Sequence, residues 1–209
     1  MNFQNKNNTL KIVISVGDDS GIGPEITLKA LHSNEIPENI DFTLVGSKKN
    51  LQTTYKKLIS LGIENLANPK NLKIHDIEIS SSSDESKLSY GNSSFYYLIK
   101  AIEIVKQYPN SALVTGPICK KSWSLAGHHF SGQTEVLAKL CGVKNVGMLF
   151  TAKSPITGWR FNTLLATTHI ALCEVPKQLS TKLIHSKLDL FKHFCSTYTD
   201  KPTLKVAGL

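Results

Sequence analysis

The sequence predicts an α/β fold built on a mostly parallel sheet. Short apolar runs that are typical of buried strands alternate with segments whose apolar residues recur at helical spacing. Glycine, proline and serine separate these segments, as expected for connecting turns. Strands that alternate with helices pair in parallel and are covered by helices. The length of 209 residues is enough for one large domain or two small ones.

The elements of the first half follow from these patterns in order. Pro24 suits the first turn of a helix that runs to about His32, and Gly62 ends the next helix. The serine-rich stretch 80–89 is expected to be a surface loop. Expected strands cover residues 10–16, 41–46, 72–77 and 112–115, and the later helices cover 51–61 and 92–107.

The second half is predicted with the same rules. A helix over 134–141 is closed by Gly142, and an amphipathic helix covers 180 to about 199. A new element begins at Val175-Pro176. Expected strands cover 146–150, 159–168 and 203–209, with a hairpin turn at 154–158 between the first two.

Composition excludes several classes of protein. The hydrophobic content of 41% supports a packed core. No apolar run approaches the roughly 18 residues of a membrane helix, and the polar N-terminus lacks the apolar region of a signal peptide. The formal charge of +8 comes almost entirely from dispersed lysines, since Arg160 is the only arginine. Because base readout favours arginine, we expect solvated lysines, no nucleic acid and no membrane as partners.

The cysteines favour a reducing, cytoplasmic location. They are widely separated, without a Cys-x-x-Cys pair, which argues against a zinc site or a disulfide framework. Their apolar or helical surroundings predict buried free thiols. The four are Cys119, Cys141, Cys173 and Cys195.

The stretch 115–135 is the strongest candidate for a ligand site. It follows an expected buried strand and precedes a helix, which is where open α/β sheets bind their ligands. Lys120 or Lys121 is suited to an anion contact or to proton transfer, and Gln133 and Thr134 to hydrogen bonds with a substrate. Each of these side chains also has an ordinary structural explanation, so the candidate rests on their clustering.

Two further features are weaker candidates. The glycine-rich turn 17–25 has the spacing G-x-x-x-G-x-G, which matches neither a Rossmann fingerprint nor a Walker A loop. Asp18 and Asp19 would also repel a phosphate, so a structural turn is favoured there. His169, at the end of the expected strand 159–168, could bind a divalent metal, although a single histidine is more often structural.

Four blocks of the sequence resemble the 4-hydroxythreonine-4-phosphate dehydrogenases of pyridoxal phosphate biosynthesis. Residues 16–25 resemble the family's Gly-Asp-Pro-Ala-Gly-Ile-Gly-Pro-Glu, and residues 113–120 resemble Leu-Val-Thr-Gly-Pro-Ile-Asn-Lys. Residues 125–135 resemble Leu-Ala-Gly-x-x-Phe-Pro-Gly-His-Thr-Glu, and residues 167–176 resemble Thr-Thr-His-Ile-Pro-Leu-Arg-Glu-Val-Pro. The blocks occur in order, with compatible spacing, along nearly the whole chain.

The resemblance implies a two-domain fold like that of the isocitrate and isopropylmalate dehydrogenases, in a homodimer with its site in the cleft. It implies domains at 1–125 and 126–209, both incomplete. It implies oxidation of the phosphorylated substrate with NAD (or NADP), followed by decarboxylation with a divalent metal such as Zn, Mg or Co. By the same resemblance Lys120 is catalytic, Gln133 and Thr134 bind substrate, and His169 is a metal ligand. It assigns no cofactor-binding residue.

The chain also departs from the family pattern. Gln133 replaces a histidine and therefore cannot carry a proton at neutral pH, Cys119 replaces an asparagine, and Asp19 replaces a proline. Members of the family continue beyond residue 209, through an Asn-Pro-His-Ala-Gly-Glu loop with a second metal histidine and a later third one. A truncated, inactive remnant that self-associates is therefore an alternative. A dehydrogenase of threonate or erythronate phosphate is another, and a lysine-rich binding protein is a weaker one.

Overall fold

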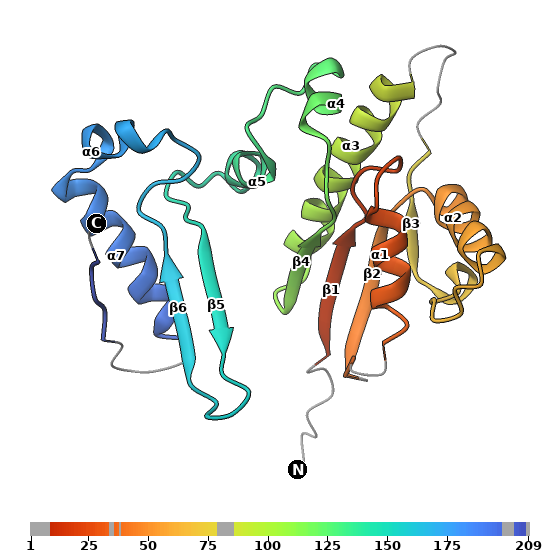
Figure 1. Ribbon diagram of the computed structural model, residues 1–209, viewed down its shortest axis with the longest axis horizontal. Helices are drawn as coiled ribbons and strands as arrows, with labels where there is room; N and C mark the ends of the chain where they lie inside the picture. The colour runs from red at the N-terminus through yellow and green to blue at the C-terminus, as the bar shows by residue number, and fades with distance from the viewer. Residues whose placement is uncertain (1–8, 34–35, 38, 79–85, 198–202, 208–209) are drawn as a thin grey trace. The chain divides into compact units, whose positions relative to one another are not determined.

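The computed structural model describes residues 9–33, 36–37, 39–78, 86–197 and 203–207. The chain forms two compact units, Met1–Leu140 and Cys141–Leu209 (Figure 1). The sequence prediction placed the boundary earlier, after residue 125, so the segment that contains Gln133 and Thr134 belongs to the first unit here.

The first unit is built on a four-stranded parallel sheet with the order β3-β2-β1-β4. In register, Val13 of β1 lies between Thr43 of β2 and Leu113 of β4. The prediction of a mostly parallel sheet is therefore confirmed. The strands are β1 (Leu10–Ser15), β2 (Ile40–Gly46), β3 (Ile74–Asp76) and β4 (Ser111–Thr115).

Helices cover both faces of this sheet. Alternate residues of a strand point to opposite faces, so neighbouring residues of β2 enter different cores. Leu44 packs with Leu28 of α1 and with α2, whereas Val45 packs with Tyr97 of α3. The helices are α1 (Gly23–Ala30), α2 (Lys48–Ser60) and α3 (Ser86–Lys106), with a short 3₁₀ turn, η1 (Pro69–Asn71), after α2.

A third apolar cluster supports the segment that follows β4. Trp123 of α4 (Lys120–Leu125) is fully buried, and it packs with Phe95 of α3 and Val136 of α5 (Gln133–Cys141). Sequence periodicity did not indicate α4. Its six residues are too few to show a helical pattern, and contact with α3 stabilises it instead.

The second unit contains a hairpin and helices. Strands β5 (Leu149–Lys153) and β6 (Arg160–Leu164) pair antiparallel through the turn predicted at 154–158. Strand β5 is shifted by three residues from the expected strand 146–150, and β6 covers only part of the expected strand 159–168. The new element expected at Val175-Pro176 is α6. The helices are η2 (Leu172–Glu174), α6 (Val175–Gln178) and α7 (Thr181–Cys195).

Several sequence predictions are wrong in detail. Residues 203–207 form no strand, although 203–209 was predicted to be one; residues 208–209 lie outside the described residues. Helix α3 already begins at Ser86, so 86–89 are helical rather than loop, and 79–85 are not described. All four cysteines are free as expected, but three of them are exposed and only Cys195 is buried. None of the described helices is long and apolar enough to span a membrane.

Candidate substrate site

Two loops interlock at the carboxyl edge of the parallel sheet, one after β1 and one after β4. The amide of Gly116 donates to the carbonyl of Ser15 (2.7 Å), and the amide of Asp18 donates to the carbonyl of Pro117 (2.9 Å). A Cβ at Gly17 would lie 2.3 Å from the Pro117 oxygen, and Gly17 has a φ of +85°. Only glycine fits this conformation and this close approach.

The other glycines of the first loop also serve backbone packing. A Cβ at Gly23 would lie 2.1 Å from the Val16 carbonyl oxygen, and one at Gly116 would lie 2.2 Å from the same atom. The space beside these glycines is therefore filled by the protein's own backbone, which leaves no cradle for a phosphate. This geometry agrees with the structural explanation of the turn 17–25.

Lys120 lies at the start of α4, immediately after the exposed Cys119. Its side chain is exposed and reaches the turn before α5, because a Cβ at Gly132 would lie 3.8 Å from Lys120 Nζ. The same Cβ would lie 3.4 Å from Glu135 Oε2. Hydrogen bonding to Ser122 lowers the pKa of the Cys119 thiol. The β4–α4 loop thus presents an ammonium group and a polarised thiol to solvent.

Gln133 connects the start of α5 to this loop. Its Nε2 donates to the Gly116 carbonyl (3.1 Å), while its buried Oε1 has no hydrogen-bond partner among the described residues. Thr134, the next residue, is exposed. The structure therefore brings Gln133 to the loop that carries Lys120 and leaves the Thr134 hydroxyl open to a ligand.

An aromatic cluster supports the site from α3. Trp123 donates from Nε1 to Ser94 Oγ (2.8 Å), and its ring meets Phe95 edge-on. His128 stacks on Phe95 with 3.7 Å between ring centroids, and its Nε2 lies 2.9 Å from Asn92 Oδ1. Burial, and then the neighbouring His129, lower the pKa of His128. We infer that a neutral His128 donates to Asn92 in a supporting role. Sequence reasoning missed this role, because these contacts join residues 36 positions apart.

His169 lies in the second unit, on the loop after β6. It is exposed and has a left-handed backbone with a φ of 57°. Because β6 ends at Leu164, His169 is not at the end of a strand, as the sequence had suggested. Within the described part of the chain, no three His, Cys, Asp or Glu side chains are grouped to hold a metal ion. The residues present therefore do not make a divalent metal site.

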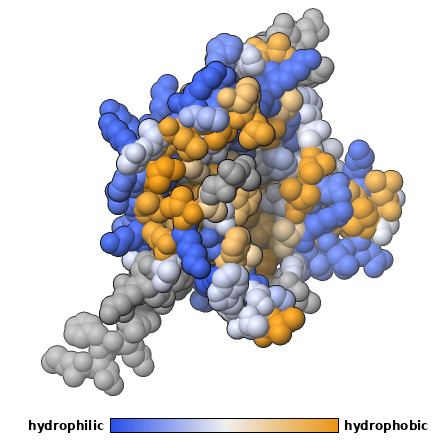
Figure 2. Space-filling model, turned by 60° about the vertical axis from the view of Figure 1, so that its left-hand side comes forward, coloured by the Kyte–Doolittle hydropathy of each residue, from blue (hydrophilic) through white to orange (hydrophobic). Residues whose placement is uncertain are grey.

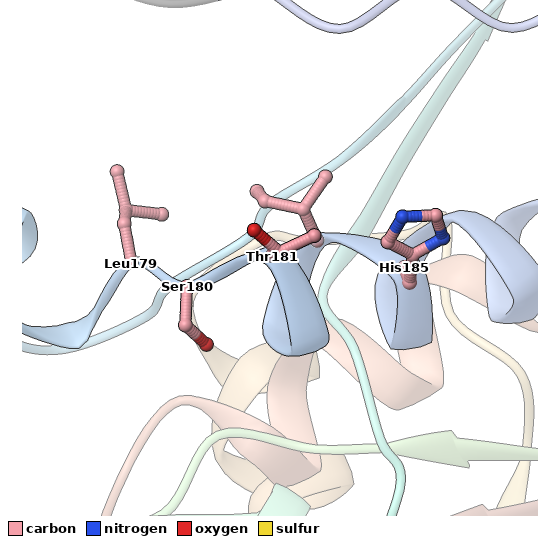
Figure 3. Close-up of a pocket in the computed structure, with 5 residues that line it drawn as sticks. Leu179, Ser180, Thr181 and His185 are labelled. Carbon is pink, nitrogen blue, oxygen red and sulfur yellow. The ribbon is translucent and has the colours of Figure 1, made fainter.

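A shallow hollow in the second unit lies at the start of α7 (Figure 3). None of the four candidate residues lines it. Ser180 Oγ accepts a hydrogen bond from the amide of Leu183 (3.2 Å), which is the ordinary cap of a helix N-terminus. The hollow is therefore explained by the end of the helix. Its lining residues are Leu179, Ser180, Thr181, Ile184 and His185.

The sheet and its loops define an α/β protein whose candidate site lies where parallel strands end, as in enzymes that bind small anionic metabolites. The family model described as pyridoxal phosphate biosynthetic protein PdxA matches residues 38–209. The chain belongs to this family.

Named relatives agree with this assignment. The chain is 43% identical over 201 residues to the 4-hydroxythreonine-4-phosphate dehydrogenase of Synechococcus sp. (strain RCC307), which covers 95% of the chain and 60% of the relative. It is 44% identical over 187 residues to that of Nostoc sp. (strain PCC 7120), covering 86% and 52%. The chain thus spans between 52% and 60% of the length of these two relatives.

Solved structures show the same fold. The 4-hydroxythreonine-4-phosphate dehydrogenase of Burkholderia phymatum matches with a TM-score of 0.73 at 19% identity, over 94% of this chain and 61% of that one. The enzyme of the same name from Klebsiella pneumoniae matches with a TM-score of 0.71 at 22% identity, over 90% and 59%. At these TM-scores the chain shares its fold with both structures.

Proposed function

We propose that this chain supplies the Lys120 side of the substrate site in a dehydrogenase that oxidises and decarboxylates 4-hydroxythreonine 4-phosphate for pyridoxal phosphate biosynthesis. The observation that carries the proposal is the 43% identity, over 95% of the chain, to a relative with this name. The position of the candidate residues, at the carboxyl edge of a parallel sheet, supports it. The proposal includes a cytoplasmic homodimer, as the resemblance implies.

Three residues have separate roles in binding the substrate. The exposed ammonium of Lys120 attracts the anionic groups of a phosphorylated amino acid and is placed to hold or pass on a proton. The exposed hydroxyl of Thr134 donates a hydrogen bond to a substrate oxygen. Gln133 is assigned to substrate binding by the family resemblance, and its buried Oε1 becomes available to a substrate hydroxyl or ammonium only when the side chain turns away from Gly116. The amide cannot carry a proton, so proton transfer is assigned to Lys120.

The cofactors of the proposal come from family membership alone. NAD or NADP would accept the hydride, and a divalent metal would favour loss of carbon dioxide. Among the described residues, backbone fills the space beside the glycines of the glycine-rich turn, and His169 belongs to no group of three or more metal-ligating side chains. By the family resemblance, His169 would contribute one imidazole ligand to that metal.

Substrate binding by the chain tests the proposal most directly. Isothermal titration with 4-hydroxythreonine 4-phosphate should show binding that Thr134→Val and Lys120→Met each weaken roughly tenfold, the value of one lost hydrogen bond or ion contact. Threonate 4-phosphate, which lacks the amino group, distinguishes the alternative substrate class. Lys144→Met, an exposed lysine outside 115–135, serves as the matched control.

NADH formation with substrate, NAD and Mg²⁺ gives the second measurement. Substrate-dependent NADH supports the full activity, whereas binding without NADH supports only the substrate half of the proposal. Failure to bind any of these phosphate esters would overturn the proposed role of Lys120 and Thr134. Tighter binding of threonate 4-phosphate would move the proposal to that substrate.

A further inference from the structure

A carboxylate in the glycine-rich loop takes no part in the proposed chemistry. Asp19 occupies the position where the family pattern quoted above has proline. Its Oδ2 accepts a hydrogen bond from the hydroxyl of Tyr97 (2.6 Å), a residue of α3 that is 78 positions away. Its Oδ1 is buried and has no hydrogen-bond partner among the described residues. The carboxyl group is thus half satisfied.

The backbone around Asp19 links three parts of the first unit. Its carbonyl accepts from Asn50 Nδ2 of α2 (3.0 Å). The preceding residue, Asp18, is the one whose amide donates to Pro117 in the loop after β4. The loop that holds Asp19 is therefore fastened to α2, to α3 and to the loop that leads to Lys120.

The charged groups around Asp19 disfavour its ionised form. Asp18 is the neighbouring carboxylate, and Asp76, at the end of β3, acts on Tyr97 with the same sign. No lysine or arginine bonds the Asp19 carboxylate in the described residues; the described ion pairs of the first unit lie elsewhere. Burial is the largest influence and, with Asp18, it raises the pKa of Asp19 to about 6, against the opposing hydrogen bond from Tyr97.

We propose that Asp19 is a positioning residue whose proton controls how tightly the loop from Gly17 to Gly23 is held against α3 and the loop after β4. With the proton bound, the neutral acid stays buried beside Tyr97. When the proton leaves, one buried carboxylate oxygen has no partner, and the loop loosens so that water can reach it. The device acts on the position of the loop, so it does not depend on the proposed function.

The direction of the effect follows from linkage. The pKa is about 6 with the loop closed and near its ordinary 3.8 when the carboxylate reaches water. The closed loop therefore binds the proton more tightly, is most stable below pH 4, and loses stability as the pH rises to about 6. The ratio of closed to open loop is therefore on the order of a hundredfold lower above pH 6 than below pH 4.

Hydrogen exchange at single amides measures this ratio. The amides of Asp18, Ser20 and Gly21 all form hydrogen bonds within or from the loop. Their protection factors, corrected for the intrinsic pH dependence of exchange, should fall on the order of a hundredfold between pH 4 and pH 7.5. Carboxyl-carbon NMR should show Asp19 titrating over the same pH range as this fall.

Three conservative substitutions separate this mechanism from a general loss of structure. Asp19→Asn should abolish the fall in amide protection between pH 4 and pH 7.5. Tyr97→Phe removes the hydrogen bond that favours the ionised acid and should move the midpoint to higher pH. Asp18→Asn removes the neighbouring charge and should move it to lower pH, while its Oδ1 still accepts from Ser20. A histidine such as His128, whose pKa is lowered, has the opposite pH dependence and stays present in all three variants.

The proposal is overturned if the fall in amide protection persists in Asp19→Asn, or if Tyr97→Phe and Asp18→Asn move the midpoint in the same direction. It is also overturned if Asp19 titrates near pH 6 without any change in loop protection. Substrate binding by the wild-type chain, measured at pH 5 and pH 7.5, shows separately whether affinity at the candidate site changes together with loop protection. Loss of binding at both pH values would count against the proposed function alone.

Discussion

The two units of the chain differ sharply in how much apolar side chain they bury. Among the described residues, every buried hydrophobic side chain except Cys195 belongs to the first unit. The hairpin of the second unit instead leaves Phe150, Trp159 and Phe161 between 52% and 65% exposed. Apolar side chains on the molecular surface are visible in Figure 2. A sheet covered on both faces has a core on each, whereas a two-stranded hairpin is marginal by itself.

This difference separates the candidate residues into two kinds. Lys120 and Gln133 begin α4 and α5, two helices that pack in one apolar cluster around the buried Trp123. Gln133 is also bonded to the loop after β4. His169 lies on an exposed loop of the unit with little core. A site is effective when packed elements hold its side chains in place. The candidate residues of the first unit are therefore held more firmly than His169, and the comparison can be tested by perturbing equivalent features in each unit.

The two tryptophans should give the largest difference. Trp123→Ala removes a fully buried indole, its contact with Phe95 and its hydrogen bond to Ser94, and should lower the free energy of unfolding by about 3–5 kcal/mol. Trp159→Ala removes a side chain that is 65% exposed and should change it by less than about 1 kcal/mol. Urea unfolding followed by circular dichroism measures both. Equal losses would show that the second unit is as well packed as the first.

Two glycines, one in each unit, compare packing against rigid backbone with packing against a movable side chain. A Cβ at Gly116 meets the Val16 backbone at 2.2 Å, whereas one at Gly147 meets the end of the Leu164 side chain at 2.6 Å. Backbone in a paired sheet cannot move aside, but the tip of a leucine can. Gly116→Ala should therefore cost about 2–3 kcal/mol and Gly147→Ala about 1 kcal/mol or less. Thermal melts of both variants test this, and a larger loss for Gly147→Ala would contradict the comparison.

The sequence predicted the first unit better than the second for a physical reason. Strands β1 and β2 are apolar runs with buried residues on both faces, so their pattern is strong. Strand β4 was also predicted as a buried strand, but it lies at the edge of the sheet, where Ala112 and Val114 are exposed. The expected strand 203–209 also contains several apolar residues. However, the described residues 203–207 have no strand partner, and Val206 is 64% exposed. A strand needs a neighbour to hydrogen-bond, and periodicity alone does not supply one. The local pattern was correct only where the fold provided a pairing partner.

The candidate site was predictable in location but not in detail. The position of Lys120 and Thr134 after β4 followed from the rule that ligands bind where parallel strands end. The bond from Gln133 to Gly116 and the bond from Tyr97 to Asp19 join distant residues, and no spacing in the sequence indicates them. Asp19 was interpreted as a charge that repels phosphate, although in the fold it is turned toward α3. Tertiary contacts therefore decide what these polar residues do.

Ion pairs should show the smallest difference between the units. Lys11 and Asp41 join β1 to β2 at 2.5 Å, with side chains 12% and 37% exposed, and Lys73 adds a second contact to Asp41. The hydrogen bond from Lys11, helped by the one from Lys73, lowers the pKa of Asp41. The ion pair therefore stabilises the fold at neutral pH, and this stabilisation is lost in acid as Asp41 takes up a proton. The matched pair in the second unit, Glu174 with Lys177, is more exposed and lies within one helical turn.

Asp41→Asn should therefore lower the free energy of unfolding by about 1 kcal/mol at pH 7, and Glu174→Gln by about 0.3 kcal/mol or less. Raising the salt concentration should reduce the first loss only partly, because Lys11 is mostly buried, and should remove the second. Urea titrations of both variants at low and high salt separate the two cases. If Glu174→Gln proved the more costly, the second unit would depend on surface charge for the stability that it does not obtain from a core.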